Sequence, residues 1–143
     1  MTCYIASGWF NMSQTQDLEN IKETLSSCGV EYFSPKDECK LGPHASSKNR
    51  KRVFTANLDA IENSQFIIVN TRDKDMGTIF EAGYAYKCGV PIIYFCEGLV
   101  GNFNLMLAES GLAVATSRWE LGEIIEEIQK TSTTTKKYRG TIE

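Results

Sequence analysis

The feature that most constrains the fold is the apolar run at residues 66–70, which leads into residues 75–85. Consecutive large apolar residues of this kind are typical of a strand buried on both faces in a parallel α/β sheet. The pattern then changes to a spacing of three and four residues, at Ile79, Ala82, Gly83 and Tyr86. That spacing predicts a helix. We therefore expect a strand, a loop that holds Asp75, and a helix.

Two carboxylates belong to this unit. Asp75 lies beyond the carboxyl end of the strand, where open α/β sheets bind their ligands, and Glu81 falls within the first two turns of the helix. Gly77 gives the loop freedom to turn, and Thr78 is a candidate helix cap. Such a pair suits an acid or base working beside a nucleophile or an electrostatic stabiliser. In the alternative, Asp75 only caps the helix and Glu81 faces water.

Bulk properties exclude several classes of protein. A length of 143 residues predicts one domain, residues 1–143, with a core that needs no disulfide or metal. The net charge of −3 argues against a general nucleic-acid binder. No apolar run approaches the roughly 20 residues that span a bilayer, and no cleavable apolar leader is visible, so a cytoplasmic protein is predicted. The five cysteines lack C-x-x-C spacing and are expected to be reduced and mostly buried, and the single His44 excludes a multi-histidine metal site.

Strand and helix patterns alternate along the chain. The predicted strands are residues 3–7, 30–33, 66–70, 90–95 and 112–115. The predicted helices are residues 13–28, 48–63 and 119–130, with one more that ends near residue 87. This alternation predicts a five-stranded parallel sheet, doubly wound, in a flavodoxin-like or Rossmann-like three-layer sandwich. Neither a dinucleotide-binding G-x-G-x-x-G after the first strand nor a P-loop motif is present.

Two segments lack a periodic pattern. Residues 34–49 are polar and hold two prolines and a glycine, and they predict a long loop of the kind that often forms a lid or binding segment. Residues 131–143 begin as a polar tract, and their composition predicts disorder.

Four separated features together resemble a known family. They are residues 4–10, 75–85, 104–106 and 138–143. In this order, each at a ligand-facing position, they resemble the nucleoside 2-deoxyribosyltransferases, enzymes that move 2-deoxyribose from one nucleobase to another. The resemblance runs nearly end to end. It implies a 2′-deoxynucleoside and a free nucleobase as substrates, and no metal or cofactor.

The resemblance also implies roles for individual residues. Glu81 matches the nucleophile that attacks C1′ and holds the sugar as a covalent ester. Asp75 matches an aspartate that binds substrate and handles the proton of the base, and Tyr4 matches the tyrosine that orients the nucleophile. Phe10 matches an aromatic residue of the base pocket, and the neighbouring Trp9 adds flat apolar surface for stacking.

Further positions complete the predicted site. Gly8 and Gly77 are counted among its substrate-binding residues, because both follow the carboxyl end of a predicted strand. Asn104 and Met106 match a pair that the family supplies to the sugar site from a neighbouring subunit. The carboxylate of Glu143 matches one that reaches the sugar end of a site across subunits. A homodimer or homohexamer with shared sites is therefore implied.

The chain departs from the family pattern at two places. Asn57 stands where the family has an aspartate, and Asp59 lies two positions later. Either Asp59 substitutes or the acid function on the base side is altered. Residues 36–40 also lack the glutamine with which the family recognises the base.

Three other functions compete with transfer. Water could capture the same ester, giving a nucleoside or deoxynucleotide N-glycosidase, but residues 8–12 contain no Arg or Lys to hold a phosphate. A phosphoribohydrolase of the cytokinin-activating type has a loop that partly resembles residues 77–81, but its preceding glycine pair is missing here. A non-catalytic nucleoside sensor would not need Glu81, Asp75 and Tyr4 together.

Overall fold

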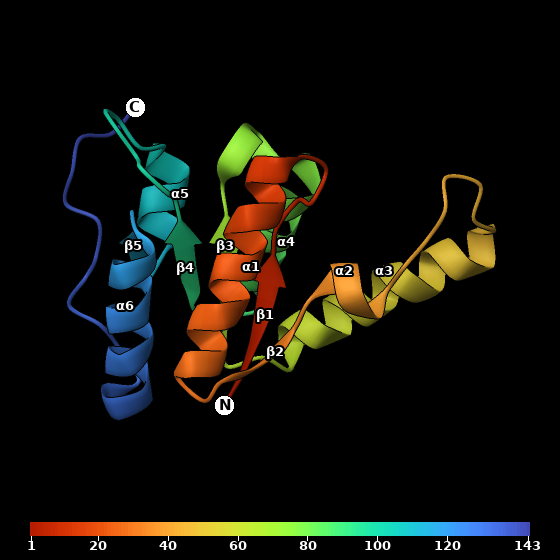
Figure 1. Ribbon diagram of the computed structural model, residues 1–143, viewed down its shortest axis with the longest axis horizontal. Coiled ribbons are helices and arrows are strands. Elements are labelled where there is room, and N and C mark those ends of the chain that lie inside the picture. Colours follow the sequence, from red (N-terminus) through yellow and green to blue (C-terminus); the bar gives the residue numbers. More distant parts are fainter.

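The computed structural model describes residues 1–143 and contains five parallel strands between two layers of helices (Figure 1). The strands are β1 (Thr2–Ala6), β2 (Glu31–Phe33), β3 (Phe66–Asn70), β4 (Ile92–Phe95) and β5 (Ala113–Ala115). Their order in the sheet is β2-β1-β3-β4-β5, and every neighbouring pair is parallel. This is the flavodoxin-like order of a doubly wound fold, which confirms the predicted three-layer sandwich.

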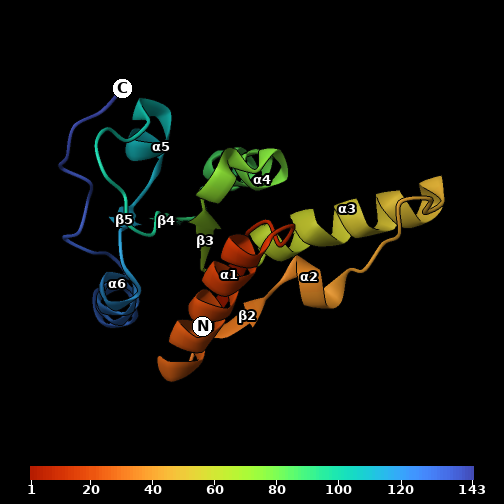
Figure 2. The ribbon, with the colours of Figure 1, turned by 45° about the horizontal axis from the view of Figure 1, so that its top comes forward.

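Helices cover both faces of the sheet. They are α1 (Met12–Ser27), α2 (Pro35–Glu38), α3 (Ser47–Glu62), α4 (Met76–Lys87), α5 (Leu105–Ser110) and α6 (Arg118–Thr131), with the 3-10 turn η1 (Arg72–Lys74). One layer is formed by α1 and α6, and the other by α4, α5 and the end of α3 (Figure 2). No helix is long and apolar enough to cross a membrane.

The central strand β3 shows why its sequence does not alternate between apolar and polar residues. Phe66 and Ile68 pack with α1 and α6, whereas Ile67 and Val69 pack with the opposite layer. All four are completely buried. Because burial of such a side chain contributes about 1.5–3 kcal/mol, a polar residue on either face of this strand would be costly.

Two helix starts differ from the predicted ones. The N-cap of α1 is Asn11, not Ser13, and its side chain accepts a hydrogen bond from the Gln14 N–H at 2.8 Å. The N-cap of α4 is Asp75, not Thr78, and it accepts from the Thr78 N–H at 3.0 Å. A cap precedes the first helical residue and bonds to the third, so Thr78 receives the cap rather than providing it.

The segment predicted as one long loop contains more structure than its composition indicated. Pro35 begins the single turn of α2, and α3 starts at Ser47 and extends beyond the edge of the sheet (Figure 2). Because the first half of α3 lies beyond the sheet, Phe54 is exposed, and its ring lies beside Phe80 of α4 with centroids 6.0 Å apart.

The prediction of a disordered C-terminal tail is wrong. The Phe103 N–H donates to the Thr141 carbonyl, and the Glu143 N–H donates to the Phe103 carbonyl, both at 2.9 Å. The Tyr138 ring packs against Phe103 with centroids 5.3 Å apart. One aromatic anchor and a short pairing thus fix a segment whose average composition is polar.

All five cysteines are free, but only Cys3 and Cys96 are buried, so the expected burial of most of them is not observed.

Candidate active site

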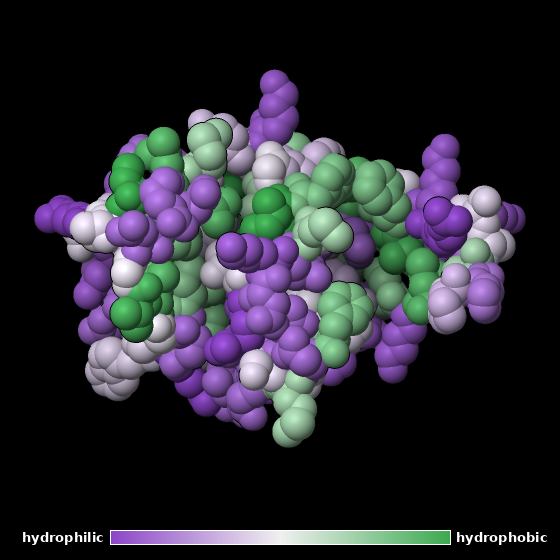
Figure 3. All heavy atoms as spheres, turned by 90° about the horizontal axis from the view of Figure 1, so that it is seen from above, coloured by the Kyte–Doolittle hydropathy of each residue, from purple (hydrophilic) through white to green (hydrophobic).

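The carboxyl edge of the sheet holds the candidate site. The order of the strands reverses between β1 and β3, and the crevice at such a switch point is where open α/β sheets bind ligands. The loop after β1 carries Phe10 and the loop after β3 leads to Asp75. Figure 3 looks down on this edge and shows apolar side chains among hydrophilic ones. The exposed apolar residues of these loops and of α4 include Phe10 (72 %), Met76 (87 %) and Phe80 (55 %).

Glu81 is partly buried on the second turn of α4, and its Oε2 atom is buried without a hydrogen-bond partner. Burial raises the pKa of Glu81 from 4.5 to about 7; the charge of Asp75 acts in the same direction, and the Tyr4 hydroxyl in the opposite one. The carboxyl group is therefore balanced between its acid and base forms near neutral pH. Buried polar atoms are seldom left unpaired in folded proteins, so Oε2 is a strong candidate for contact with a ligand.

Tyr4 lies in the centre of the sheet, completely buried, and its hydroxyl also has no hydrogen-bond partner. Burial, together with the negative charge of Glu81, raises the pKa of Tyr4. The hydroxyl therefore keeps its proton and is available as a donor. The ring is held flat against Phe33 of β2, with centroids 5.6 Å apart and an angle of 12° between the planes.

Asp75 combines a structural position with a place beside Glu81. Its Oδ2 atom accepts hydrogen bonds from the Thr78 N–H at 3.0 Å and from the Thr78 hydroxyl at 2.8 Å, so Asp75 does cap the helix. Its charge nevertheless acts on Glu81, and its Oδ1 atom takes no part in the cap. Gly77 lies in the first turn of α4 without a positive φ, so the turn does not require a glycine there.

Asn57 and Asp59 lie on different sides of α3. The Asn57 side chain is directed inward, and its Oδ1 atom is buried without a partner. Asp59 is exposed, because two residues along a helix correspond to a rotation of about 200°. The structure therefore does not bring Asp59 to the position that Asn57 occupies, and a substitution of one for the other is not observed.

The aromatic loop after β1, residues 8–10, has one inner and one outer ring. Trp9 packs partly against the core beneath α1, and Phe10 faces solvent; their ring centroids lie 5.3 Å apart. Gly8 faces the Gln14 side chain, and a Cβ atom at Gly8 would stand 2.8 Å from it. The glycine at this position is therefore explained by a close approach within the protein.

Asn104, Met106 and Glu143 form a second cluster at the start of α5. Asn104 accepts from the Met106 N–H at 2.9 Å, and the Leu105 N–H donates to Glu143 at 3.0 Å. Met106 is exposed. No hydrogen bond or ion pair joins this cluster to Tyr4, Asp75 or Glu81 of the same chain. The predicted site residues thus fall into two groups, one around Glu81 and one around α5.

The carboxyl edge of the sheet also holds polar residues that the sequence did not predict as part of the site. Ser34, at the carboxyl end of β2, carries the fourth buried side-chain atom without a partner, and its position after a strand was the available sequence signal. Gln14 contacts both loops of the site, and Asp17 binds Asn70 and Arg72 at the second loop, but neither residue belongs to a motif. No group of three or more His, Cys, Asp or Glu side chains could hold a metal ion.

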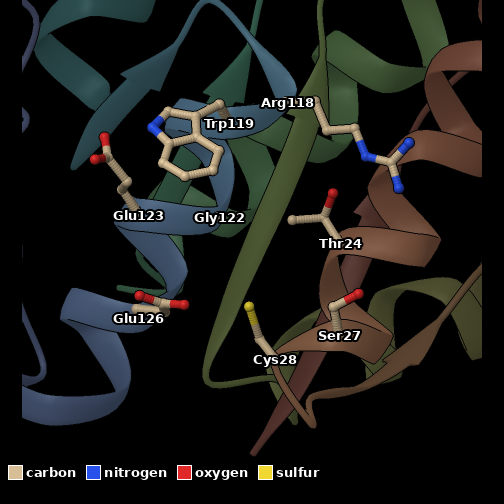
Figure 4. A pocket seen from close by; sticks show the side chains of 8 residues that line it. All are labelled: Thr24, Ser27, Cys28, Arg118, Trp119, Gly122, Glu123 and Glu126. Atoms are coloured by element: carbon tan, nitrogen blue, oxygen red, sulfur yellow. The ribbon is translucent and has the colours of Figure 1, made fainter.

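Two hollows lie away from Glu81. One, of about 520 Å³, lies between α1 and α6 on the opposite face of the sheet, beside Trp119 and Arg118 (Figure 4). None of its lining residues has a buried unpartnered polar atom. The other, of about 460 Å³, is mostly apolar and lies between α4 and α5, where Gly83, Tyr86 and Met106 line it. Gly83 and Tyr86, predicted from spacing as part of the helix, are exposed at this hollow.

The fold and the site define an α/β protein of flavodoxin-like topology with a partly buried carboxylate at its switch point. The sequence profile of the nucleoside 2-deoxyribosyltransferase family matches residues 3–118. The chain therefore belongs to the nucleoside 2-deoxyribosyltransferase family. No sequence among the curated proteins matches it significantly.

One solved structure supports this assignment, and two others share the fold. The chain is similar to the 2-deoxyribosyltransferase of the psychrotolerant bacterium Bacillus psychrosaccharolyticus, with a TM-score of 0.82 and 25% identity over 97% of this chain and 100% of that one. A conserved protein of Enterococcus faecalis V583 has the same fold, with a TM-score of 0.70 and 16% identity over 89% and 98% of the two chains. So does the CMP N-glycosidase of Clostridium botulinum, with a TM-score of 0.59 and 15% identity over 88% and 99%.

Proposed function

We propose that the protein transfers 2-deoxyribose between nucleobases through a covalent ester on Glu81. The observation that carries the proposal is the pair of buried, unpartnered atoms at the switch point, Glu81 Oε2 and the Tyr4 hydroxyl. Membership of the family and similarity to a 2-deoxyribosyltransferase support it. Its substrates would be a 2′-deoxynucleoside and a free nucleobase.

In the first step the ionised Glu81 carboxylate attacks C1′ of the nucleoside. The bond between C1′ and the base nitrogen breaks, its electron pair leaves with the base, and a new bond forms between C1′ and a Glu81 oxygen. Positive charge develops on the sugar in such a reaction, and a nearby carboxylate stabilises it. The Tyr4 hydroxyl, which has no partner in the free protein, would donate to the carboxyl group during the attack and direct the attacking oxygen.

Asp75 supplies the proton chemistry in this scheme. Its Oδ1 atom, which takes no part in the helix cap, passes a proton to the leaving base, and it takes one back from the incoming base when that base attacks C1′ and releases Glu81. Asn57 is an amide and cannot exchange protons in this way, so Asp75 carries the acid function alone. Two displacements at C1′ retain its configuration and give ping-pong kinetics.

The α5 cluster would complete the site of a second copy. One chain presents a nucleophile group around Glu81 and a separate group of Asn104, Met106 and the Glu143 carboxylate, which lie beside the apolar hollow between α4 and α5. Contact between copies across this hollow would cover Met106 and place the second group near a neighbour's sugar. The assembly is therefore proposed to be a homodimer or homohexamer with shared sites.

One experiment separates transfer from its rivals. The protein is incubated with a 2′-deoxynucleoside, with and without a different free base, and all bases and nucleosides are followed by chromatography. A new deoxynucleoside that forms only with the acceptor base supports transfer, and its loss in Glu81→Ala supports the nucleophile. Equal release of free base and deoxyribose in both mixtures would instead establish a hydrolase. Binding without turnover in the unmodified protein would establish a sensor.

A further inference from the structure

Gln14 touches both loops of the candidate site from the first turn of α1. Its side chain is only 3 % exposed. The Oε1 atom accepts a hydrogen bond from the Phe10 N–H at 2.8 Å, and the Nε2 atom donates to the Arg72 carbonyl at 3.5 Å. One amide group thus joins the aromatic loop after β1 to the loop after β3 that leads to Asp75.

The aromatic loop is shaped around this amide. Gly8 approaches it so closely that a Cβ atom would collide with the amide carbon, nitrogen and oxygen of Gln14. Asn11 caps the helix at the Gln14 N–H and also donates from Nδ2 to Asp73 at 2.8 Å. Asp73 itself has a φ of 61°, a strained conformation for a residue with a side chain. The two loops are therefore fastened to each other at two points.

The buried carboxylate of Asp17 holds the loop after β3 in place. The Arg72 guanidinium binds both carboxylate oxygens of Asp17, which is 3 % exposed on α1. Asp17 also accepts from Asn70 at 3.3 Å, and Asn70 donates to the Ser7 hydroxyl at 3.1 Å. A two-pronged ion pair on a buried carboxylate, with these additional hydrogen bonds, holds one geometry, so the Arg72 carbonyl is a fixed acceptor for Gln14.

We infer that Gln14 is a positioning residue for the proposed transfer reaction, one that sets the aromatic loop relative to Asp75 and Glu81. The base would stack on the loop, whereas its proton would go to Asp75, so the distance between the loops determines whether both contacts form together. The kinetic part of this inference rests on the proposed function. The structural part, the position of the loop, does not.

An amide is required because the two contacts are of opposite kind. The side chain accepts at Phe10 and donates at Arg72. In Gln14→Glu, an ionised carboxylate keeps the first bond but meets the Arg72 carbonyl with a second acceptor. Protonation of the introduced carboxyl restores a donor. In Gln14→Ala both contacts are lost at every pH. Gln16 is a matched control, because it is exposed on the same helix and bonds only to Asn20.

The kinetic test measures the base-exchange rate of these variants. Since a displacement of about 1 Å can cost on the order of 100-fold in rate, Gln14→Ala is expected to lower kcat/KM by about 10- to 100-fold, with a higher KM for the nucleoside. Gln16→Ala is expected to match the unmodified protein. The activity of Gln14→Glu, relative to the unmodified protein at the same pH, is expected to rise as the pH falls. A pH-independent ratio, or equal losses in the Gln14 and Gln16 variants, would overturn the inference.

A second measurement does not need activity. The chain has two tryptophans, Trp9 in the loop and Trp119, which is 79 % exposed on α6, so Trp119→Phe leaves Trp9 as the only one. In this background Gln14→Ala is expected to increase quenching of Trp9 fluorescence by acrylamide at least twofold, while circular dichroism shows the same helix content. Unchanged quenching would refute the positioning role whether or not the protein transfers deoxyribose. Absence of transfer in the unmodified protein, with the quenching changed, would refute only the proposed function.

Discussion

Replacing Glu81 by glutamine is expected to abolish transfer and to stabilise the folded protein above pH 7. The two effects have one cause. The pocket buries the carboxyl group and raises its pKa from 4.5 to about 7, which means that folding disfavours the charged form. Glutamine has a similar shape and no charge, so it removes the nucleophile and the unfavourable burial together.

The sign and size follow from proton linkage. Between pH 4.5 and 7 the folded state binds more protons than the unfolded state, because its pKa at Glu81 is the higher one. The contribution of Glu81 to stability is therefore fully present below pH 4.5 and lost as the pH rises through 7. A pKa change from 4.5 to about 7 corresponds to about 3 kcal/mol. For a domain of this size that amounts to about 10 °C in Tm.

Thermal unfolding of both proteins at pH 4.5, 6 and 8 tests this expectation. The gain in Tm for Glu81→Gln is expected to be small at pH 4.5 and to reach its full size at pH 8. Glu109→Gln serves as the control, because Glu109 is exposed and makes no ion pair, and its Tm difference should not change with pH. If Glu81→Gln were no more stable at pH 8 than at pH 4.5, relative to the unmodified protein, burial would not be the cause of the raised pKa.

Three further predictions use the same site. The acid limb of the kcat/KM profile for transfer is expected near pH 7, not near 4.5, because the attacking Glu81 must be ionised; steady-state rates between pH 5 and 9 measure it. Tyr4→Phe is expected to reduce kcat/KM at least 10-fold without loss of stability in chemical denaturation, since the hydroxyl has no partner inside the protein. Deleting residues 141–143 removes the pairing with Phe103 and the terminal carboxylate, so the truncated protein is expected to lose transfer activity while circular dichroism shows an intact fold. Mixing the truncated protein with Glu81→Ala should restore activity, because each copy lacks a different half of the shared site.

Much of the fold was predictable because most of the strands are apolar on both faces. The run at residues 66–70 is the clearest case, and its β-structure needs no information beyond the sequence. The two shortest helices, α2 and α5, were not predicted, since four and six residues are too few for a periodic pattern. The ordered tail was missed for a different reason. Its order depends on Tyr138 and Phe103, which meet only in the folded chain.

The site residues also fall into those that the sequence predicted and those that it did not. The carboxyl end of a strand and the helical spacing after it predicted that Asp75 and Glu81 face one crevice, whereas Tyr4 was assigned only by the resemblance to the family. Sequence could not show which of Asn57 and Asp59 faces inward, because that depends on how α3 is rotated against the sheet. Nor could it show the contacts of Gln14, whose partners are backbone atoms of two distant loops. Almost every residue type offers the same backbone N–H and C=O groups, so such contacts cannot be predicted from residue identity.

The positions of the two carboxylates on α4 explain why they differ. Asp75 stands at the start of the helix, where its Oδ2 atom caps the first turn by accepting two hydrogen bonds from Thr78. Glu81 stands six residues further along, in the second turn of the helix, and its Oε2 atom receives none. Burial therefore dominates at Glu81. A charge that is already satisfied is a poor nucleophile, whereas one held without partners gains most when a positively charged sugar carbon forms beside it. The six-residue separation thus places the helix cap and the proposed proton transfer at Asp75 and the attacking oxygen at Glu81.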